Sequence, residues 1–287
     1  MRYQFITDHQ SEHRITAMCR ALQVSRSGYY AWQARPESDR ARRNHRLLAR
    51  IRHIHTRSRE AYGILKTWRA LREQGETCGH NRVARLRRLH GIEARRRRRF
   101  RTGQAARHNV PAAPNLLQRQ FTVKAPDRVW AGDITFIPTR EGWLYLAVLL
   151  DLYSRKVVGW SMSEKQNQQL AIQALAMAVE HRQPNPGLLH HTDQSPLYAT
   201  PAYREIQKAH HMIPSMSRKG DCYDNAVAES FFSNLKNELT WDRDFKTRSE
   251  ARSAIFEWIE GFYNRERMHE TLDYVSPVRY EERNVIT

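Results

Sequence analysis

The chain has 287 residues, 40% of them hydrophobic, and a formal net charge of +18. This length allows about one to three domains. No apolar run reaches the roughly 18 residues of a transmembrane helix, and the N-terminal segment lacks the basic and then apolar pattern of a signal peptide. We therefore expect a soluble cytoplasmic protein with no membrane partner.

The three cysteines, Cys19, Cys78 and Cys222, are far apart, and no two of them form a CxxC pair. This spacing argues against a disulfide scaffold and against a structural zinc site. It is typical of a protein from a reducing compartment.

The positive charge lies in one part of the chain. Residues 1–120 hold 28 Lys and Arg against 8 Asp and Glu, whereas residues 121–287 hold 20 against 22. A strongly basic segment repels itself unless a polyanion relieves the repulsion, although a solvated basic surface is the simpler interpretation. We favour a nucleic-acid-binding half joined to a half with another task.

Residues 1–38 are predicted to form a helix, a tight turn and a second helix, similar to a helix-turn-helix. The first helix is indicated by apolar residues at helical spacing, and the second follows from residue 24 to residue 32. The spaced residues are Ile15, Met18, Cys19 and Leu22.

Residues 39–92 are predicted to form a helical DNA-binding domain of the helix-turn-helix type. Apolar residues recur at helical spacing in three segments, and Gly75 and Gly91 end the second and the third. In the third segment an apolar row should pack while an arginine row faces outward, as in a recognition helix; the alternative is a plain three-helix bundle with a basic face. The apolar row is Val83, Leu86 and Leu89, and the basic row is Arg82, Arg85 and Arg88.

Residues 93–120 are predicted to be a basic linker, because helical spacing stops and Gly103, Pro111 and Pro114 interrupt the segment. Five consecutive arginines lie near its start, and we expect them to contact DNA phosphates. A merely solubilising tract is the alternative. The five are Arg95, Arg96, Arg97, Arg98 and Arg99.

Residues 121–287 are predicted to form an α/β domain with a mixed five-stranded sheet and C-terminal helices, because apolar, β-branched runs alternate with helical patterns. The expected strands are 129–137, 143–150, 156–162, 188–192 and 212–216. The expected helices are 168–182, 203–210, 225–239 and 248–264.

Three acidic residues of this domain are candidates for a metal site. Asp133 lies inside the first strand, Asp193 ends the fourth, and Glu229 lies one turn into a helix. A carboxylate in an apolar strand is costly unless it is paired or bound to a metal. Each acid alone is more often structural, but three from separate elements could converge on Mg²⁺ or Mn²⁺, which prefer carboxylate and water ligands.

The helix that carries Glu229 has a second charged residue on the same side. At about 100° per residue, Glu229 and Lys236 both lie beside the apolar stripe of this helix. Asp224 is predicted to be its N-cap. Lys236 is therefore a further candidate for the site.

The sequence resembles the DDE transposases of the insertion-sequence-three family, specifically the product of their second reading frame, which belong to the retroviral-integrase superfamily. The similarity covers nearly the whole chain. There are 59 residues between Asp133 and Asp193 and 35 between Asp193 and Glu229. The other matching segments are residues 25–32 (SRSGYYAW), 62–63 (YG), 130–135 (WAGDIT), 151–155 (DLYSR), 224–226 (DNA), 229–230 (ES), 269–272 (HETL) and 276–277 (SP).

The resemblance implies an RNase H-like integrase core in which Asp133, Asp193 and Glu229 hold two Mg²⁺ or Mn²⁺ ions. It implies a polynucleotidyl transferase that cleaves the ends of an insertion sequence and joins them to target DNA. Lys236 matches a family position that handles the DNA end. The implied partners are terminal inverted repeats, target DNA, further copies of the chain, and an upstream-frame protein as a fusion or partner; the implied location is the bacterial nucleoid.

One loop departs from the family pattern. After Asp193, Ser195 replaces the usual Gly and Leu197 replaces the usual Gln. This loop leaves open one alternative, a transposase-derived DNA-binding protein without turnover. A second alternative is an RNase H-like nuclease that cuts but does not join.

Overall fold

The computed structural model describes residues 1–95, 113–218 and 222–284. The chain divides into two compact units, Met1–Arg52 and His53–Thr287, and the boundary falls inside α4 (Asp39–Arg57). None of the helices in these residues is long and apolar enough to cross a membrane.

The first unit contains three short helices around a small core. The predicted helix pair is confirmed, and a helix before it was not expected from the sequence. Gly28 leaves room near the start of the last helix for the Tyr3 side chain, because a Cβ there would lie 2.5 Å from the Tyr3 hydroxyl and would force that side chain to shift. The helices are α1 (Arg2–Asp8), α2 (Ile15–Ala21) and α3 (Arg26–Gln33), and the core is Ile6, Met18, Cys19 and Tyr29.

The second unit begins with the end of α4, followed by α5 (Ile64–Glu73) and α6 (His80–Leu89). Val83 and Leu86 of α6 are buried as predicted. The expectation for Leu89 was wrong: it is the last residue of α6 and is 65% exposed, so the apolar row stops one turn earlier.

The rest of the second unit is built on a mixed five-stranded sheet, as predicted. The strand order is β3-β2-β1-β4-β5. Strands β1, β2 and β3 are antiparallel neighbours, whereas β4 and β5 run parallel to β1. The strands are β1 (Val129–Thr139), β2 (Gly142–Asp151), β3 (Val157–Ser163), β4 (Leu189–Thr192) and β5 (Ile213–Met216).

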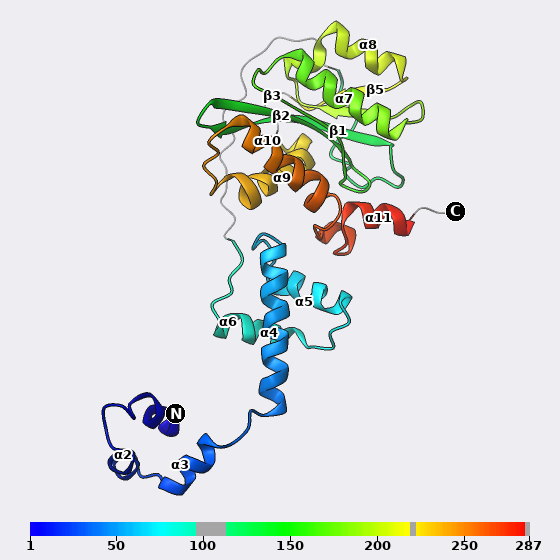
Figure 1. Cartoon of the computed structure of the whole chain (residues 1–287). Coiled ribbons are helices and arrows are strands. Elements are labelled where there is room, and N and C mark those ends of the chain that lie inside the picture. The colour runs from blue at the N-terminus through cyan, green and yellow to red at the C-terminus, as the bar shows by residue number, and fades with distance from the viewer. Residues whose placement is uncertain (96–112, 219–221, 285–287) are drawn as a thin grey trace. The chain divides into compact units, whose positions relative to one another are not determined.

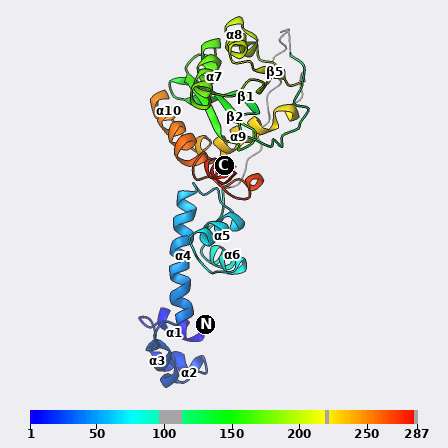
Figure 2. The same ribbon diagram turned by 90° about the vertical axis from the view of Figure 1, so that its right-hand side faces the viewer.

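Helices cover both faces of this sheet. In Figures 1 and 2, α7 (Gln168–Arg182) and α8 (Pro201–Ala209) lie on one face, and α9 (Ala226–Leu235) and α10 (Arg248–Phe256) lie on the other. Buried apolar side chains fill both layers, which hides the largely hydrophobic central strands. The predicted α/β fold is therefore confirmed.

Two of the predicted helices change type before they end. Helix α9 continues as a π-helical segment over Lys236–Thr240, and α10 does so over Glu257–Tyr263. The last helix, α11 (Pro277–Asn284), was not expected from the sequence.

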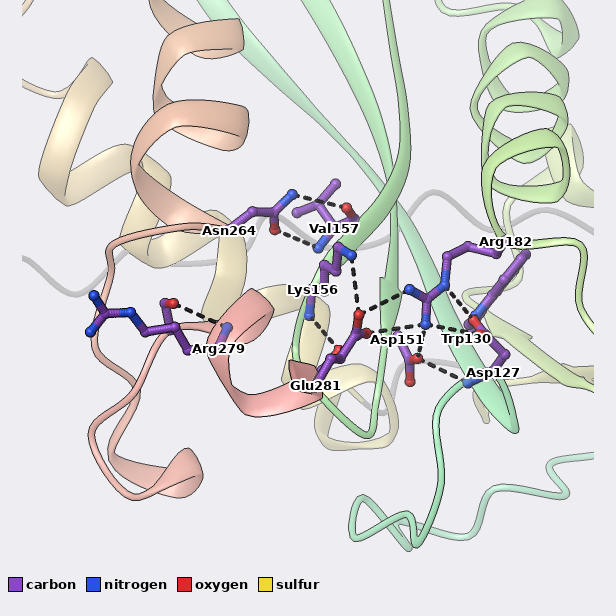
Figure 3. Close-up of polar contacts among 11 residues, drawn as sticks. Asp127, Trp130, Asp151, Lys156, Val157, Arg182, Asn264, Arg279 and Glu281 are labelled. Atoms are coloured by element: carbon purple, nitrogen blue, oxygen red, sulfur yellow. Dashed lines mark hydrogen bonds and ion pairs between the residues drawn. The ribbon is translucent and has the colours of Figure 1, made fainter. Parts of the chain in front are cut away.

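Helix α11 is fixed to the sheet by a group of ion pairs (Figure 3). Arg182 donates to Glu281 of α11 at 3.0 Å and to Asp127 at 2.8 Å, and its guanidinium lies 3.4 Å from buried Asp151. Lys156 also donates to Glu281, at 3.1 Å. The charges in this corner are therefore largely balanced within the protein.

The edge strand β3 is covered by a side chain that imitates another strand. The Asn264 amide accepts from the Val157 backbone N–H at 2.9 Å and donates to its carbonyl at 3.1 Å (Figure 3). This pairing satisfies backbone groups that an edge strand otherwise leaves open.

Candidate active site

The sheet brings Asp133 and Asp193 next to each other. Strands β1 and β4 are parallel, with Val129 opposite Leu189 and Ala131 opposite His191. If this register continues beyond the last paired residues, Asp133 lies opposite Asp193. Neighbouring strands are about 4.8 Å apart, so this register would place the two carboxylates close together, in agreement with the effect of the Asp193 charge on the pKa of Asp133.

A hydrogen bond joins the start of α9 to the same strand. The Asn225 side-chain amide donates to the carbonyl of Gly132, the residue before Asp133, at 3.3 Å. Glu229 follows one helical turn later and is half-buried. The third acid is therefore near the first two because its helix begins on β1.

The electrostatics of the site couple the three acids. Burial raises the pKa of Asp133, and the charges of Asp193 and Glu229 raise it further. Burial also raises the pKa values of Asp193 and Glu229. Burial and, at Asp133, repulsion therefore disfavour the ionised carboxylates, and a bound cation would offset both effects.

Local backbone donors hold the two aspartates. The Ile134 N–H donates to Asp133 at 2.8 Å, and the Ser195 N–H donates to Asp193 at 3.1 Å. These bonds favour the charged carboxylates and partly oppose the effect of burial. Both side chains are thus held by backbone groups close to them in the sequence.

Lys236 lies on the side of the site where it was expected. It is the first residue of the π-helical segment, and its Nζ is 5.7 Å from the centre of the Phe136 ring on β1. Burial lowers the pKa of Lys236, and the Asp133 carboxylate opposes this effect. A cationic side chain therefore borders the acidic group.

Tyr198 belongs to this site although no sequence pattern indicated it. Its hydroxyl is buried and has no hydrogen-bond partner within residues 1–95, 113–218 and 222–284. Burial raises its pKa, and the nearby charges of Asp193 and Asp133 add to the effect. Its place five residues after Asp193, in the turn that leaves the strand, is the one signal that could have found it.

The donors fit a hard divalent cation in their chemistry. They are three mutually repelling carboxylates with a neutral phenol beside them, and oxygen ligands of this kind suit Mg²⁺ or Mn²⁺. As they stand, no three His, Cys, Asp or Glu side chains of the described residues are arranged to hold one ion.

The two unusual loop residues are well accommodated. Ser195 precedes a 3₁₀ turn over Pro196–Ala199, and its hydroxyl accepts from the Leu197 N–H at 3.5 Å. Leu197 packs against the core between the sheet and α7. The loop beside Asp193 is therefore an ordered turn despite both departures.

The expected role of Asp224 was wrong. The residue that precedes α9 is Asn225, whose side chain makes no cap hydrogen bond to the helix. Asp224 is buried and accepts from Arg218 at 2.9 Å, Arg119 at 2.9 Å and Asn115 at 2.8 Å. Hydrogen bonds from Arg218, and then from Arg119, lower the pKa of Asp224, because guanidinium groups stabilise the charged carboxylate. Its partners are therefore these arginines and not the N–H groups of α9.

The predicted DNA-binding arginines differ in their surroundings. On α6, Arg85 and Arg88 are exposed and Arg82 is half-buried. Arg95 lies 3.6 Å from Glu60 and 3.4 Å from Asp242. The remaining four, Arg96 to Arg99, lie outside the described residues.

One arginine of α6 has a structural place that the sequence did not reveal. Arg87 is 3% exposed and donates to the Thr67 hydroxyl at 2.8 Å and to the Tyr62 carbonyl at 3.1 Å. Arg87 lies between the predicted apolar row and the predicted arginine row of α6, so its spacing did not indicate that it is buried.

Family comparisons agree with this arrangement. An integrase core domain matches residues 123–222, a second integrase core domain matches residues 210–277, and an HTH-like domain matches residues 42–100. The first two ranges contain the three acids, and the third contains α5 and α6.

Named relatives cover the chain nearly from end to end. It is 43% identical to the insertion element IS600 uncharacterized 31 kDa protein of Shigella sonnei, over 93% of this chain and 98% of the relative. It is 41% identical to transposase InsF for insertion sequence IS3A of Escherichia coli (strain K12), over 99% of this chain and 100% of the relative.

The solved magnesium complex of the HTLV-2 integrase catalytic core is similar at 18% identity and a TM-score of 0.42, over 54% of this chain and 97% of that one. The identity and coverage of the two named relatives are sufficient to assign the family. The chain belongs to the integrase-core transposases of IS3-type insertion sequences.

Proposed function

We propose that the chain is a metal-dependent polynucleotidyl transferase that cleaves the ends of its insertion sequence and joins them to target DNA. The observation that carries the proposal is that the three acids are near one another: the charges of Asp193 and Glu229 raise the pKa of Asp133. Such a group is costly unless a cation binds it. The family membership supports the same chemistry.

In this proposal Asp133, Asp193 and Glu229 hold two Mg²⁺ or Mn²⁺ ions. Bound ions of this kind activate an attacking oxygen and stabilise the leaving oxygen of a phosphodiester. Lys236, at the border of the site, binds a phosphate near the DNA end as a point charge. When the ions are bound, the Tyr198 hydroxyl, which makes no hydrogen bond within the described residues, would donate to one of the carboxylates and keep its orientation.

We further propose that function is divided along the chain. Residues 1–38 and 39–92 recognise the terminal inverted repeats, 93–120 form a basic linker, and 121–287 perform catalysis. The HTH-like match supports the second part and the integrase core matches support the last. The paired ends imply several copies on DNA at the nucleoid, with an upstream-frame protein as a fusion or partner.

The ordered loop around Ser195 and Leu197 supports an active enzyme over a DNA-binding protein without turnover. Ser195 still donates its N–H to Asp193, and Leu197 still contributes to the core. The two departures therefore leave the support of the second acid in place.

A strand-transfer assay tests the proposal. The chain is incubated with a labelled duplex that carries the end of its element, with target DNA, and with Mg²⁺, Mn²⁺ or Ca²⁺. We expect joined products with Mg²⁺ or Mn²⁺ and little chemistry with Ca²⁺, whose looser coordination suits the reaction poorly. Cut ends alone would indicate a nuclease, and binding alone a derived DNA-binding protein.

A further inference from the structure

Tyr62, just before α5, and Lys66, in the first turn of α5, contact the loop that follows the π-helical end of α10. The Tyr62 hydroxyl accepts from the Met268 N–H at 2.7 Å and donates to the Glu266 carbonyl at 3.2 Å. The Lys66 ammonium donates to the Met268 carbonyl at 2.8 Å. The backbone on both sides of Arg267 is therefore fixed by Tyr62 and Lys66, all within the unit His53–Thr287.

Arg267 itself joins this loop to the helix of the third acid. Its guanidinium donates to both oxygens of Glu238, with N–O distances of 2.7 to 3.0 Å, and both residues are almost fully buried. Glu238 lies in the π-helical continuation of α9, two residues after Lys236 and nine after Glu229. A buried, forked ion pair of this kind fixes both partners in orientation.

The opposite end of the connection is α6. Arg87 of α6 donates to the Tyr62 carbonyl, while the flanking Arg85 and Arg88 are exposed. Hydrogen bonds, joined by short stretches of the chain, therefore connect α6 through Tyr62 and Arg267 to Glu238. We call these four residues, Arg87, Tyr62, Arg267 and Glu238, the relay.

An open pocket of about 300 Å³ lies beside the relay, lined by Ile54, Tyr62, Phe262, Met268 and Tyr274 among others. Tyr62 and Met268 are themselves buried, so polar and apolar contacts together align the two sides. The relay ends on a π-helical segment, a feature that is frequent at functional sites.

We propose that Tyr62 and Arg267 are positioning residues that transmit the docking of α6 on DNA to the helix bearing Glu229 and Lys236. DNA held by α6 then favours one placement of α9, in which these two side chains face the DNA end. This inference rests on the proposed function, because it assigns the relay a role in cleavage.

Hydrogen exchange tests the relay without metal or turnover. We compare the parent, Tyr62→Phe and Tyr263→Phe, free and with saturating element-end duplex. Tyr263 is the matched control: it is buried, and its hydroxyl donates to the Arg155 carbonyl at 3.0 Å, outside the relay. Its ring lies 5.9 Å from the Arg267 guanidinium, but Phe keeps this ring and removes only the hydroxyl. DNA should slow exchange at residues 236–240 in the parent and in Tyr263→Phe, and Tyr62→Phe should lose this protection. Equal protection in all three proteins would overturn the proposal.

A cleavage experiment separates positioning from folding. Two duplexes share the same terminal nucleotides, but one is too short to reach α6. In the parent the long duplex should be cleaved faster, and Tyr62→Phe should lower the long-to-short ratio by about two- to tenfold, the effect of losing a hydrogen bond or two. A merely structural loss would reduce both rates alike and leave the ratio unchanged, which would contradict the relay.

Arg267→Lys completes the test, because it keeps the charge and removes the fork. Adding Tyr62→Phe to Arg267→Lys should lower the ratio no further if both act in one connection, whereas independent effects would multiply and overturn the relay. If the parent cleaves neither duplex, the proposed function fails, and hydrogen exchange still decides whether α6 and α9 are connected.

Discussion

Residues 1–120 and residues 121–287 differ in net charge and in how their charged side chains are placed. The first region holds 28 basic against 8 acidic residues, and the arginines of α6 that flank Arg87 point into solvent. The second region is nearly neutral, with 20 against 22, and places several of its charges in buried or half-buried pairs. Arg182 with Glu281 and Arg267 with Glu238 are examples.

The charged groups that are not neutralised within a region indicate what that region binds. In the second region Asp133, Asp193 and Glu229 repel one another with Lys236 as the nearby cation. In the first, the excess is positive, and among the described residues Arg85 and Arg88 of α6 are exposed. A protein tolerates such unbalanced groups at a cost in stability, so each is expected where a ligand of opposite charge binds. The first region suits a polyanion and the second suits metal cations.

The largest effect should follow from neutralising one acid of the site. Asp133→Asn, Asp193→Asn or Glu229→Gln should lower DNA cleavage by about a thousandfold or more, because each removes a proposed metal ligand with little change of shape. DNA affinity should stay near that of the parent. Cleavage and affinity are measured on the same preparations.

Metal-dependent stability gives the same three variants a second readout. Without metal, each should melt at or above the melting temperature of the parent, because one source of repulsion is gone. Mg²⁺ should raise the melting temperature of the parent more than that of any variant. Near-normal cleavage by one variant would show that its residue is not part of the site.

A smaller effect is expected from the balanced corner of the second region, through its dependence on pH. Burial raises the pKa of Asp151 to about 7, although the Asp127 and Tyr153 N–H groups oppose this. An unfolded Asp has a pKa of about 3.9, so the folded carboxyl retains its proton over the interval between these values. Its contribution to stability is complete below the unfolded pKa and is lost as the pH rises toward 7.

The free energy of unfolding of the parent should therefore fall between about pH 4 and pH 7, by up to about 4 kcal/mol relative to Asp151→Asn. Denaturant titrations at several pH values measure this slope. Asp244 is an exposed control: its hydrogen bond from Arg140 lowers its pKa, so Asp244→Asn should leave this pH interval unaffected. A parallel pH dependence of parent and Asp151→Asn would contradict the assignment.

The sequence predicted the sheet and its main helices well, because both leave periodic patterns. The five strands are apolar and β-branched, and the α7 and α9 segments have apolar residues at helical spacing. Helices α1 and α11 were missed, because they are short and each buries few apolar side chains. What holds α11 is Glu281, whose partners lie more than 90 residues away in the chain and leave no local signal.

The site was predicted unevenly for a similar reason. Asp133 and Asp193 were candidates because a carboxylate in or beside an apolar strand is unusual. Tyr198 was missed because its burial depends on how the turn after Asp193 folds. Arg87 and Asp224 were missed or misassigned because their partners come from other segments, and spacing along one helix cannot show them.

The smallest effects should come from single exposed arginines of the basic region. Arg85→Gln and Arg88→Gln should each weaken DNA binding a few-fold, and if α6 enters the major groove they should cost preference for the element ends. Changing Arg95–Arg99 to Gln should instead weaken binding to all sequences alike. The slope of log affinity against log salt should then shrink by about 0.9 for each DNA phosphate that the variant no longer neutralises.

Arg243→Gln, which changes an exposed arginine of the second region, is the control for both predictions and should change neither the sequence preference nor the salt slope. Binding measured over a salt series, on element ends and on unrelated duplexes, separates these outcomes. If Arg85→Gln lowers both affinities equally, α6 contacts only the DNA backbone; if the five-residue change leaves the salt slope intact, the arginine run serves only as a solvated linker.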